Sequence, residues 1–377
     1  MDNLYKIWFV VLASQCMLLA GQETETTVFD VQSYGATGDG YSDDTQAFED
    51  AWKATCNFSE SSPTMHIPEG HEFLLQPLTF SGPCKSNNIT FLVDGKIIAP
   101  SEPHDWKCGG DGESCEEWIV FENLDGIIIS GAGTIAGQGS NWWPLSCDDD
   151  KLACHKKPTA LVISKSNNVR LNGLSFEDNP QVHISLEGST GVFVSYLTIK
   201  APGDSPNTDG IHIQSSTNIF VSNSLISTGD DCISIGSGTS NVNISDITCG
   251  PGHGISIGSL SKNGDYETVE YIYVKDIVFK GTSNGCRIKT WQTSAVNIDN
   301  VIYSDVHGTS NKKDAVHLAC SETTPCTNII MDDIKLKLTT KDKNGENNEA
   351  ESYCLNVEGV TNGNVIPQVS CLTEVSP

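Results

Sequence analysis

Short segments in which apolar and polar residues alternate recur along most of this 377-residue chain, separated by turns rich in Gly, Asn and Ser. Examples are Phe91–Val93, Ile97–Ala99, Trp118–Phe121 and Ile127–Ile129. Strict alternation puts every second side chain on the same face, which is typical of β-strands with one buried side. The pattern therefore predicts a protein built mainly of short strands.

One segment has helical spacing instead. Asp43–Cys56 carries its apolar residues on a single stripe: Ala47, Phe48, Ala51 and Trp52. This spacing predicts a helix that Asp43 or Asp44 can cap. Phe29–Tyr34, which comes before it, is predicted to be the first strand.

A longer period links the strands in the middle of the chain. Ile211–Ile213, Ile233–Ile235 and Ile255–Ile257 follow one another at steps of 22 residues. Aliphatic residues hold the matching position over a wider span: Ile163, Leu186, Ile213, Ile235, Ile257, Ile288 and Leu318. A repeat of this length indicates a solenoid in which each repeat forms one coil. We therefore expect an all-β fold, a right-handed parallel β-helix with the predicted helix as its N-terminal cap.

Turns and spacings refine this picture. Asparagines such as Asn168 and Asn218 suit the corners between strands, because asparagine tolerates left-handed backbone. After Ile257 the repeat lengthens to 31 and then 30 residues. This change predicts longer loops, of the kind that often line a binding face.

The chain has no internal linker or change of composition, so we expect residues 22–377 to form a single domain. Residues 1–21 differ, because an apolar run from Ile7 to Ala20 follows a weakly charged start. This pattern predicts a secretory signal peptide. A membrane anchor is the alternative, although the run is short for a spanning helix of about 20 residues.

Fourteen cysteines also favour an oxidising, extracellular location. No Cys-x-x-Cys spacing occurs, so we expect no metal site. Pairing in chain order is our working hypothesis: Cys56–Cys84, Cys108–Cys115, Cys147–Cys154, Cys232–Cys249, Cys320–Cys326 and Cys354–Cys371. Cys16 lies in the predicted signal peptide, and this order leaves Cys286 unpaired. Glycosylation sequons that begin at Asn57, Asn88 and Asn243 fit the same location.

The net charge of −26 argues against nucleic acid and anionic membranes as partners. The segment Gly131–Ala136 loosely matches a dinucleotide-binding motif, but no amphipathic helix follows it. We interpret this segment as a turn and expect no cofactor. We also expect a monomer.

Acidic residues precede two of the Ile-x-Ile strands at the same register. Asp209 and Asp231 each stand two residues before the first isoleucine, and His253 holds this place in the next repeat. Stacked strands lie ~4.8 Å apart, so these positions should form one ladder, with Asp230 beside it. Like charges this close repel one another, which favours an active site over a structural role. Paired carboxyls can hydrolyse a glycosidic bond, one as proton donor and one as activator of water.

Strand alternation also places later residues. If Ile288 faces the interior, Arg287 and Lys289 face outward, where they could bind a carboxylated sugar. Cys286 should then be a buried thiol.

The same alternation would turn Asp209 and Asp231 toward the interior. They reach the outer surface only if Gly210 and Cys232 end the turn instead of continuing a regular strand. We expect this arrangement.

Four short motifs together resemble the signatures of polygalacturonases, glycoside hydrolase family 28. They are Asn207-Thr-Asp-Gly210, Gly229-Asp-Asp-Cys232, Gly252-His-Gly254 and Arg287-Ile-Lys289. Each motif alone usually marks a turn or a solvated face. The resemblance is specific because the four motifs occur together at one register of the repeat. Ser205–His212, Gly137–Trp143 and the cysteine pattern look most like the plant branch.

The resemblance implies a secreted, extracellular enzyme of the cell wall that hydrolyses α-1,4-linked galacturonan (pectin or polygalacturonate) with inversion. By motif position, Asp230 would be the general acid, and Asp209 and Asp231 would activate water. His253 would position and tune the acid. Arg287, Lys289 and Asn207 would bind or support the substrate. Inversion predicts carboxyl groups ~6.5–9.5 Å apart.

Several alternatives stay open. Endo attack is favoured over exo attack, and a rhamnogalacturonan hydrolase, a calcium-dependent pectate lyase and a non-catalytic, allergen-like wall-binding β-helix are the competitors. The family commonly has a substrate-contacting tyrosine after the Arg-x-Lys motif, and Lys313–Ala319 contains none. Because the chain is so acidic, we expect an acidic pH optimum.

Overall fold

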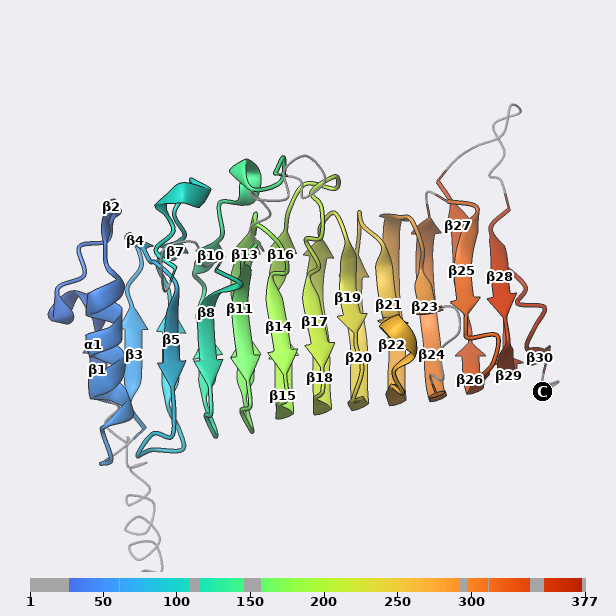
Figure 1. Ribbon diagram of the computed structural model, residues 1–377, viewed down its shortest axis with the longest axis horizontal. Helices are drawn as coiled ribbons and strands as arrows, with labels where there is room; N and C mark the ends of the chain where they lie inside the picture. Colours follow the sequence, from blue (N-terminus) through green and yellow to red (C-terminus); the bar gives the residue numbers. More distant parts are fainter. Residues whose placement is uncertain are drawn as a thin grey trace, which may run out of the picture.

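The computed structural model describes residues 27–60, 62–108, 115–145, 157–291, 297–310, 312–339 and 349–374. The predicted signal peptide, residues 1–21, and the hypothetical Cys147–Cys154 pair lie outside these residues. Figure 1 shows strands stacked side by side along one long axis, with helix α1 (Thr45–Cys56) at the N-terminal end. The fold is the parallel β-helix that the repeat predicts.

One sheet contains ten strands, and all of its pairings are parallel. In chain order these strands are β5 (Leu78–Ser81), β8 (Glu117–Glu122), β11 (Thr159–Ser164), β14 (Ile184–Glu187), β17 (Ile211–Gln214), β19 (Asp231–Ile235), β21 (Gly254–Leu260), β23 (Cys286–Thr290), β25 (Asp314–Ala319) and β28 (Glu351–Leu355). We refer to it as the ten-stranded sheet.

The other sheet, the twenty-stranded sheet, covers the remaining sides of the coils. Its strands are β1 (Val28–Asp30), β2 (Asp39–Asp43), β3 (Thr64–Ile67), β4 (Glu72–Leu74), β6 (Thr90–Val93), β7 (Lys96–Ile98), β9 (Ile128–Ser130), β10 (Thr134–Ala136), β12 (Arg170–Asn172), β13 (Ser175–Glu177), β15 (Thr190–Ser195), β16 (Thr198–Lys200), β18 (Thr217–Ser227), β20 (Thr239–Cys249), β22 (Thr268–Thr282), β24 (Asn297–Ser310), β26 (Cys326–Asp332), β27 (Lys335–Leu338), β29 (Val357–Asn362) and β30 (Thr373–Glu374). The long strand β18 pairs with both β15 and β16 of the preceding coil, so it spans two sides of its own coil.

The predicted aliphatic ladder is confirmed residue by residue. Ile163 pairs with Leu186, and the ladder then continues through Ile213, Ile235, Ile257, Ile288 and Leu318. Each of these side chains is fully buried. A column of stacked branched aliphatic side chains therefore holds successive coils in register.

Corner residues adopt the left-handed backbone that the asparagine pattern predicts. Asn168 and Asn218 have φ values of 53° and 57°. The same conformation recurs at other asparagines: Asn123, Asn241, Asn300, Asn328 and Asn356. Asparagine tolerates this region better than most residues, so it can turn the chain at each coil.

The N-terminal cap differs from the prediction in detail. Phe29–Tyr34 is not one strand, because β1 ends at Asp30 and the 3-10 helix η1 (Val31–Tyr34) follows. The Asp30 carboxylate accepts a hydrogen bond from the backbone N–H of Gln32, which starts this turn. The predicted stripe of α1 is buried, as expected, with Phe48 and Ala51 fully inaccessible. Three further short 3-10 helices lie in described loops: η2 (Pro103–Asp105), η3 (Gly139–Asn141) and η4 (Lys262–Gly264).

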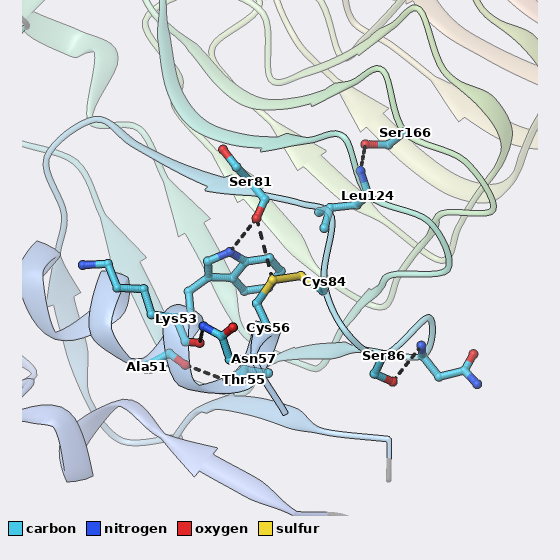
Figure 2. The surroundings of a disulfide bond; sticks show 12 residues. Ala51, Lys53, Thr55, Cys56, Asn57, Ser81, Cys84, Ser86, Leu124 and Ser166 are labelled. Atoms are coloured by element: carbon cyan, nitrogen blue, oxygen red, sulfur yellow. Dashed lines mark hydrogen bonds between the residues drawn. A yellow bond between two sulfur atoms is a disulfide. The ribbon is translucent and has the colours of Figure 1, made fainter. Parts of the chain in front are cut away.

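Five of the six hypothetical disulfides form: Cys56–Cys84, Cys108–Cys115, Cys232–Cys249, Cys320–Cys326 and Cys354–Cys371. Figure 2 shows the first of them, which ties the end of α1 to the loop after β5, beside the hydrogen bond from Trp52 Nε1 to the Ser81 carbonyl. Cys286 is free and buried, as predicted. In the described part of the chain, no helix is long and apolar enough to cross a membrane.

Candidate active site

Asp209 reaches the outer surface because its strand starts after it. Strand β17 begins at Ile211, so Asp209 and Gly210 belong to the preceding turn, as predicted. The Asp209 carbonyl accepts hydrogen bonds from the backbone N–H and the Nδ1 of His183, at 2.9 and 3.0 Å. Burial lowers the pKa of His183 to about 4. A neutral, fully buried imidazole therefore fixes the backbone of Asp209.

The expectation that Cys232 ends the turn is wrong, because β19 already begins at Asp231 and includes Cys232. Asp231 reaches the outer surface through a bulge instead. It pairs with Gly254, whereas Ile233 pairs with Ile255, so β19 contains one extra residue, Cys232, at this point. Such a β-bulge resets the alternation of side chains. Cys232 and Ile233 can therefore both be fully buried while the Asp231 carboxylate lies on the outer side.

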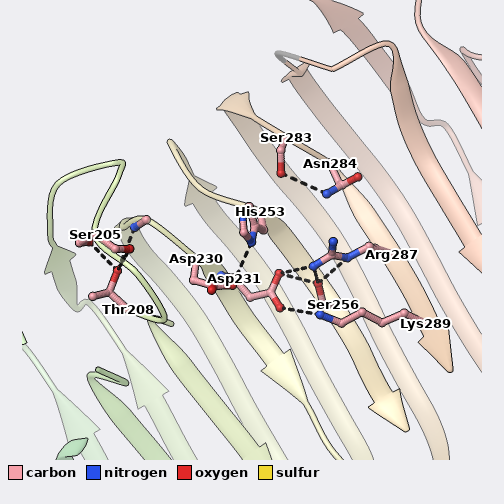
Figure 3. A network of polar contacts seen from close by, with 11 residues as sticks. Ser205, Thr208, Asp230, Asp231, His253, Ser256, Ser283, Asn284, Arg287 and Lys289 are labelled. Carbon is pink, nitrogen blue, oxygen red and sulfur yellow. Dashed lines mark hydrogen bonds and ion pairs between the residues drawn. The ribbon is translucent and has the colours of Figure 1, made fainter. Parts of the chain in front are cut away.

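The Asp231 carboxylate is buried under cationic and hydroxyl groups (Figure 3). Its Oδ1 accepts hydrogen bonds from Ser256 Oγ at 2.6 Å and from Arg287 Nη2 at 3.2 Å. Lys289 Nζ lies 3.5 Å from its Oδ2. Asp231 is only 2% exposed, so these three partners compensate for the water that it has lost. Arg287 and Lys289 face outward from β23, as strand alternation predicts.

Asp230 and His253 form a second pair beside this cluster. Asp230 Oδ1 accepts hydrogen bonds from the Asp231 backbone N–H at 2.8 Å and from His253 Nδ1 at 2.9 Å. Burial raises the pKa of Asp230, but the hydrogen bond from His253 and the charge of that ring outweigh this effect, so the pKa falls below its usual value. In the free site Asp230 is therefore ionised.

Asp230 and Asp231 lie close together on this surface. One oxygen of Asp230 lies within 4.8 Å of one oxygen of Asp231. The reason is local, because the Asp230 side chain turns back to accept the N–H of its own neighbour.

The remaining acid, Asp209, behaves differently. Burial, followed by repulsion from Asp230 and Asp231, raises the pKa of Asp209 to about 7, against a smaller opposing effect of a hydrogen bond with Ser234 and of the Lys289 charge. Three carboxyl groups that share one surface cannot all be ionised cheaply. In weakly acidic solution the proton of this cluster therefore lies on Asp209.

The turn that carries Asp209 is also tied to the turn that carries Asp230. Thr208 is fully buried, and its Oγ1 accepts the backbone N–H of Gly229 at 3.0 Å and bonds with Ser205 Oγ at 2.7 Å. Asn207 plays no such part, since no described residue hydrogen-bonds its exposed side chain. Its φ of 55° shows that it turns the backbone.

The sequence motifs missed three outward residues of the site: His212, Ser234 and Ser256. Each is the middle residue of an Ile-x-Ile strand, and all three stand in one ladder with Arg287. The signal was therefore present in the repeat, because the middle position of every such strand must face outward.

Asp230, Asp231 and His253 could in principle hold a metal ion, since one ligand atom of each lies within 4.8 Å of the others. Asp231 already has Arg287 and Lys289 as cationic partners. A divalent ion would have to compete with these two charges, so the donor set does not fit a resident metal well.

A tyrosine does lie further along the same ladder. Lys313–Ala319 contains none, but the pairing of β25 with β28 brings Tyr353 against His317, with ring centroids 4.6 Å apart. His317 follows Arg287 in the ladder. An aromatic side chain thus stands two coils beyond the arginine, where sequence spacing gave no hint of it.

Comparisons with known proteins identify the family of this chain. The family model described as Glycosyl hydrolases family 28 matches residues 57–303 and 291–358. A probable polygalacturonase of Arabidopsis thaliana is 40% identical over 93% of this chain and 81% of its own length. A polygalacturonase of Prunus persica is 38% identical over 91% and 93%.

Solved structures show the same fold at low sequence identity. The polygalacturonase from Erwinia carotovora superposes with a TM-score of 0.61 at 22% identity, over 96% of both chains. An exopolygalacturonase from Thermotoga maritima gives 0.64 at 18% identity, over 84% of this chain and 91% of its own. With a family match over most of its length and plant relatives at this identity, the chain belongs to the plant branch of glycosyl hydrolases family 28 and is a glycoside hydrolase.

Proposed function

We propose that this enzyme is a polygalacturonase, which hydrolyses α-1,4 linkages between galacturonate units of pectin. The observation that carries the proposal is the pair of cationic side chains, Arg287 and Lys289, beside Asp231. A guanidinium and an amine stand at the outer surface within 3.5 Å of a carboxylate. These are the groups that a carboxylated sugar requires beside the acids that cut the bond. The names of the plant relatives support this substrate.

In this mechanism Asp230 protonates the leaving oxygen. Its Oδ1 is occupied by two N–H donors, so the acidic proton would be carried by the other oxygen, Oδ2. In the free site, however, the proton lies on Asp209. The galacturonate carboxylate would bind at Arg287 and Lys289, and Lys289 is also one of the charges that lower the pKa of Asp230, after the larger effect of His253. The mechanism requires that a proton pass from Asp209 to Asp230 when substrate binds, which leaves Asp209 ionised.

Asp209 and Asp231 would then activate water. Lys289 interacts by charge with Asp209 as well as with Asp231 and Asp230, so one amine couples the three acids. His253 would hold Asp230 in place. Arg287 and Lys289 would bind the substrate carboxylate, and the exposed Asn207 would contact the sugar chain.

We further propose that hydrolysis inverts the anomeric centre, as family resemblance implies. The short distance between Asp230 and Asp231 gives no support for this, so the pair that matters would be Asp230 and Asp209. Proton NMR during hydrolysis should show the β-anomer of the new reducing end first. Initial appearance of the α-anomer would contradict inversion.

Endo attack is the preferred mode, with exo attack as the alternative. Product sizing over time on a defined oligogalacturonate separates them, since an endo enzyme releases mixed oligomers early and an exo enzyme releases monomers.

We also propose secretion to the cell wall, where the five described disulfides would be stable. Mass spectrometry of protein from a secreting host should then find glycans at the exposed Asn57 and Asn88, and at Asn243.

The central test uses polygalacturonate at acid pH. The wild-type chain should release reducing ends, and Asp230→Asn should lose that activity. An ultraviolet-absorbing, unsaturated product that requires calcium would identify a lyase instead. Preferred cleavage of rhamnogalacturonan would change the substrate, and binding without cleavage would indicate a non-catalytic wall protein.

A further inference from the structure

Two aromatic rings are stacked on the outer surface of the twenty-stranded sheet. Phe193 of β15 pairs in register with Phe220 of β18, and their ring centroids lie 4.8 Å apart with planes inclined by 4°. The Arg170 guanidinium, from the coil before, lies 5.3 Å from the centre of the Phe193 ring. Phe220 nevertheless remains 40% exposed. Phe193 covers one face of the Phe220 ring, and the other face is directed along the coil axis toward the next coil.

The next coil places an asparagine against this open face. Asn243 of β20 is the register partner of Phe220, and Tyr273 of β22 is the register partner of Asn243. Asn243 faces outward, because its neighbours Val242 and Ile244 are buried. No described residue forms a hydrogen bond with its side-chain amide. A side chain this short cannot cover a phenyl ring, so the ladder has a gap between its two aromatic neighbours.

This gap has the dimensions of one further ring. Strands of successive coils lie ~4.8 Å apart, so Phe220 and Tyr273 are separated by roughly 10 Å along the axis. Packed rings have centroids about 4.5–7 Å apart, which leaves room for one ring between the two residues. A pyranose sugar would fit, because its C–H face is apolar and is removed from water when it packs on an aromatic ring.

Asn243 is also the first residue of a glycosylation sequon, Asn243-Ile-Ser245. Glycosylation forms a bond between Asn243 Nδ2 and the anomeric carbon of N-acetylglucosamine. The bond from that carbon to a lipid pyrophosphate carrier breaks, and the amide releases one proton. We propose that this first sugar lies in the gap between Phe220 and Tyr273 and completes the stack. The inference rests on the proposed secretion, because the carrier is met in the secretory pathway.

The position of the sequon also decides between occupants of this surface. Beyond Tyr273 the ladder stays apolar, with Ile302, Ile330 and Val360 at the matching positions. An exposed apolar stripe of this kind marks a contact with another molecule. A glycan attached in the middle of the stripe would exclude a large partner, because it is bulky and solvated. The occupant that fits is therefore the glycan of the chain itself.

Protein from a secreting host that makes oligomannose glycans allows three tests of this placement. Mass spectrometry of peptides should first find a glycan on Asn243. If Asn57 and Asn88 carry glycans and Asn243 does not, the inference fails and the proposed secretion stands. If none of the three carries a glycan, both fail. Activity on galacturonan enters neither result, so the proposed reaction is judged separately.

The second test observes the sugar directly. An endoglycosidase trims each glycan of the folded protein to one N-acetylglucosamine, which carbon-13 labelling makes visible by NMR. Stacking on Phe220 should shift the ring protons of the Asn243 sugar upfield of those at Asn57 and Asn88. This shift should disappear in Phe220→Ser. Equivalent signals from all three sugars would overturn the inference.

The third test measures thermal unfolding of the one-sugar form with a matched pair of variants. Ser245→Ala removes the sequon and Ser245→Thr keeps it, while Asn243 is unchanged in both. Ser245→Thr should melt like the wild type, and Ser245→Ala should melt about 2 °C lower, as expected for the loss of one ring contact. In a Phe220→Ser background the two variants should melt together. An equal difference with and without the Phe220 ring would show that the sugar acts without this contact, which would overturn the inference.

Discussion

The outer surfaces of the two sheets differ although their interiors are alike. On the ten-stranded sheet one outward ladder reads Ser185, His212, Ser234, Ser256 and Arg287. On the twenty-stranded sheet a ladder through the same coils reads Arg170, Phe193, Phe220, Asn243 and Tyr273. The first lies beside the acids and supplies Ser256 and Arg287 as partners of Asp231, and the second is largely aromatic.

The second ladder is held together by its own side chains. The rings of Phe193 and Phe220 are stacked, with centroids 4.8 Å and planes 4° apart, and the Arg170 guanidinium lies 5.3 Å above Phe193. No acidic residue stands among these five positions. The comparison shows that the buried aliphatic columns determine how the coils stack, while the outward residues determine which chemistry each surface can perform. Substitutions on the two surfaces should therefore separate activity from stability.

The largest effect is expected at the proposed acid. Asp230→Asn should lower kcat by about 10²- to 10⁴-fold, because a general acid contributes this much, and should leave the melting temperature nearly unchanged. Steady-state kinetics and thermal unfolding check both values. Asp246→Asn removes the same charge from an exposed corner of β20 and should retain full activity. A kcat loss of less than tenfold in Asp230→Asn would refute the assignment.

The two arginines of the chain lie one on each surface, so they form a matched pair. Arg287→Met removes a partner of the buried Asp231 carboxylate and should cost about 3 kcal/mol of unfolding free energy, together with most of the activity. Arg170→Met removes an exposed cation–π contact and should cost about 0.5 kcal/mol with normal kinetics. Equal stability losses in the two variants, measured by urea unfolding, would erase the distinction between the surfaces.

Two disulfides each separate their cysteines by 17 residues, Cys232–Cys249 beneath the site and Cys354–Cys371 in the C-terminal coil. Removing either as a double Cys→Ser variant should lower the free energy of unfolding by about 3 kcal/mol, because loops of equal length are released. Only loss of Cys232–Cys249 should also lower kcat, because Cys232 forms the bulge that presents Asp231. The same kcat in both double variants would show that the bulge holds without its cross-link.

The pH dependence of the free energy of unfolding should reveal the raised pKa of Asp209. The pKa of Asp209 is raised to about 7 in the folded protein. The contribution of this group to the free energy of unfolding is therefore fully present below its unfolded pKa near 4 and is lost as the pH rises through about 7. Asp209→Asn should remove this decline and gain on the order of 2 kcal/mol relative to wild type at pH 8. Urea unfolding at pH 4 and pH 8 measures the difference. A wild-type advantage that grows with pH would contradict the raised pKa.

The smallest effect is expected on the aromatic ladder. Phe220→Ser breaks the stack with Phe193 and should cost about 1 kcal/mol, with kcat and KM unchanged. Thermal unfolding and kinetics measure it. A marked change in kcat would mean that the two surfaces are coupled through the interior.

Much of this architecture could be predicted from the sequence. The aliphatic ladder from Ile163 to Leu318 follows directly from the repeat, because buried positions in a stack of coils must carry similar side chains. Arg287 and Lys289 follow from alternation around Ile288. The order of the cysteines was enough to pair five disulfides, since neighbouring coils bring sequential cysteines together.

Other features depend on geometry that no period reveals. The bulge at Cys232 adds a residue without changing the 22-residue step between Ile211, Ile233 and Ile255. The turn of Asp230 onto its neighbour's N–H is decided by a single side-chain rotation. Residues that act across coils, such as His183 on the Asp209 carbonyl, are separated by a whole repeat and carry no motif of their own.

The site draws on coils that follow one another from His183 to Lys289. A ribosome releases this stretch in order, so the clustered acids emerge before the arginine and lysine that neutralise them. Until β23 has docked, the growing protein holds the Asp231 carboxylate without its two cationic partners, so the coil that completes the site also neutralises this acid.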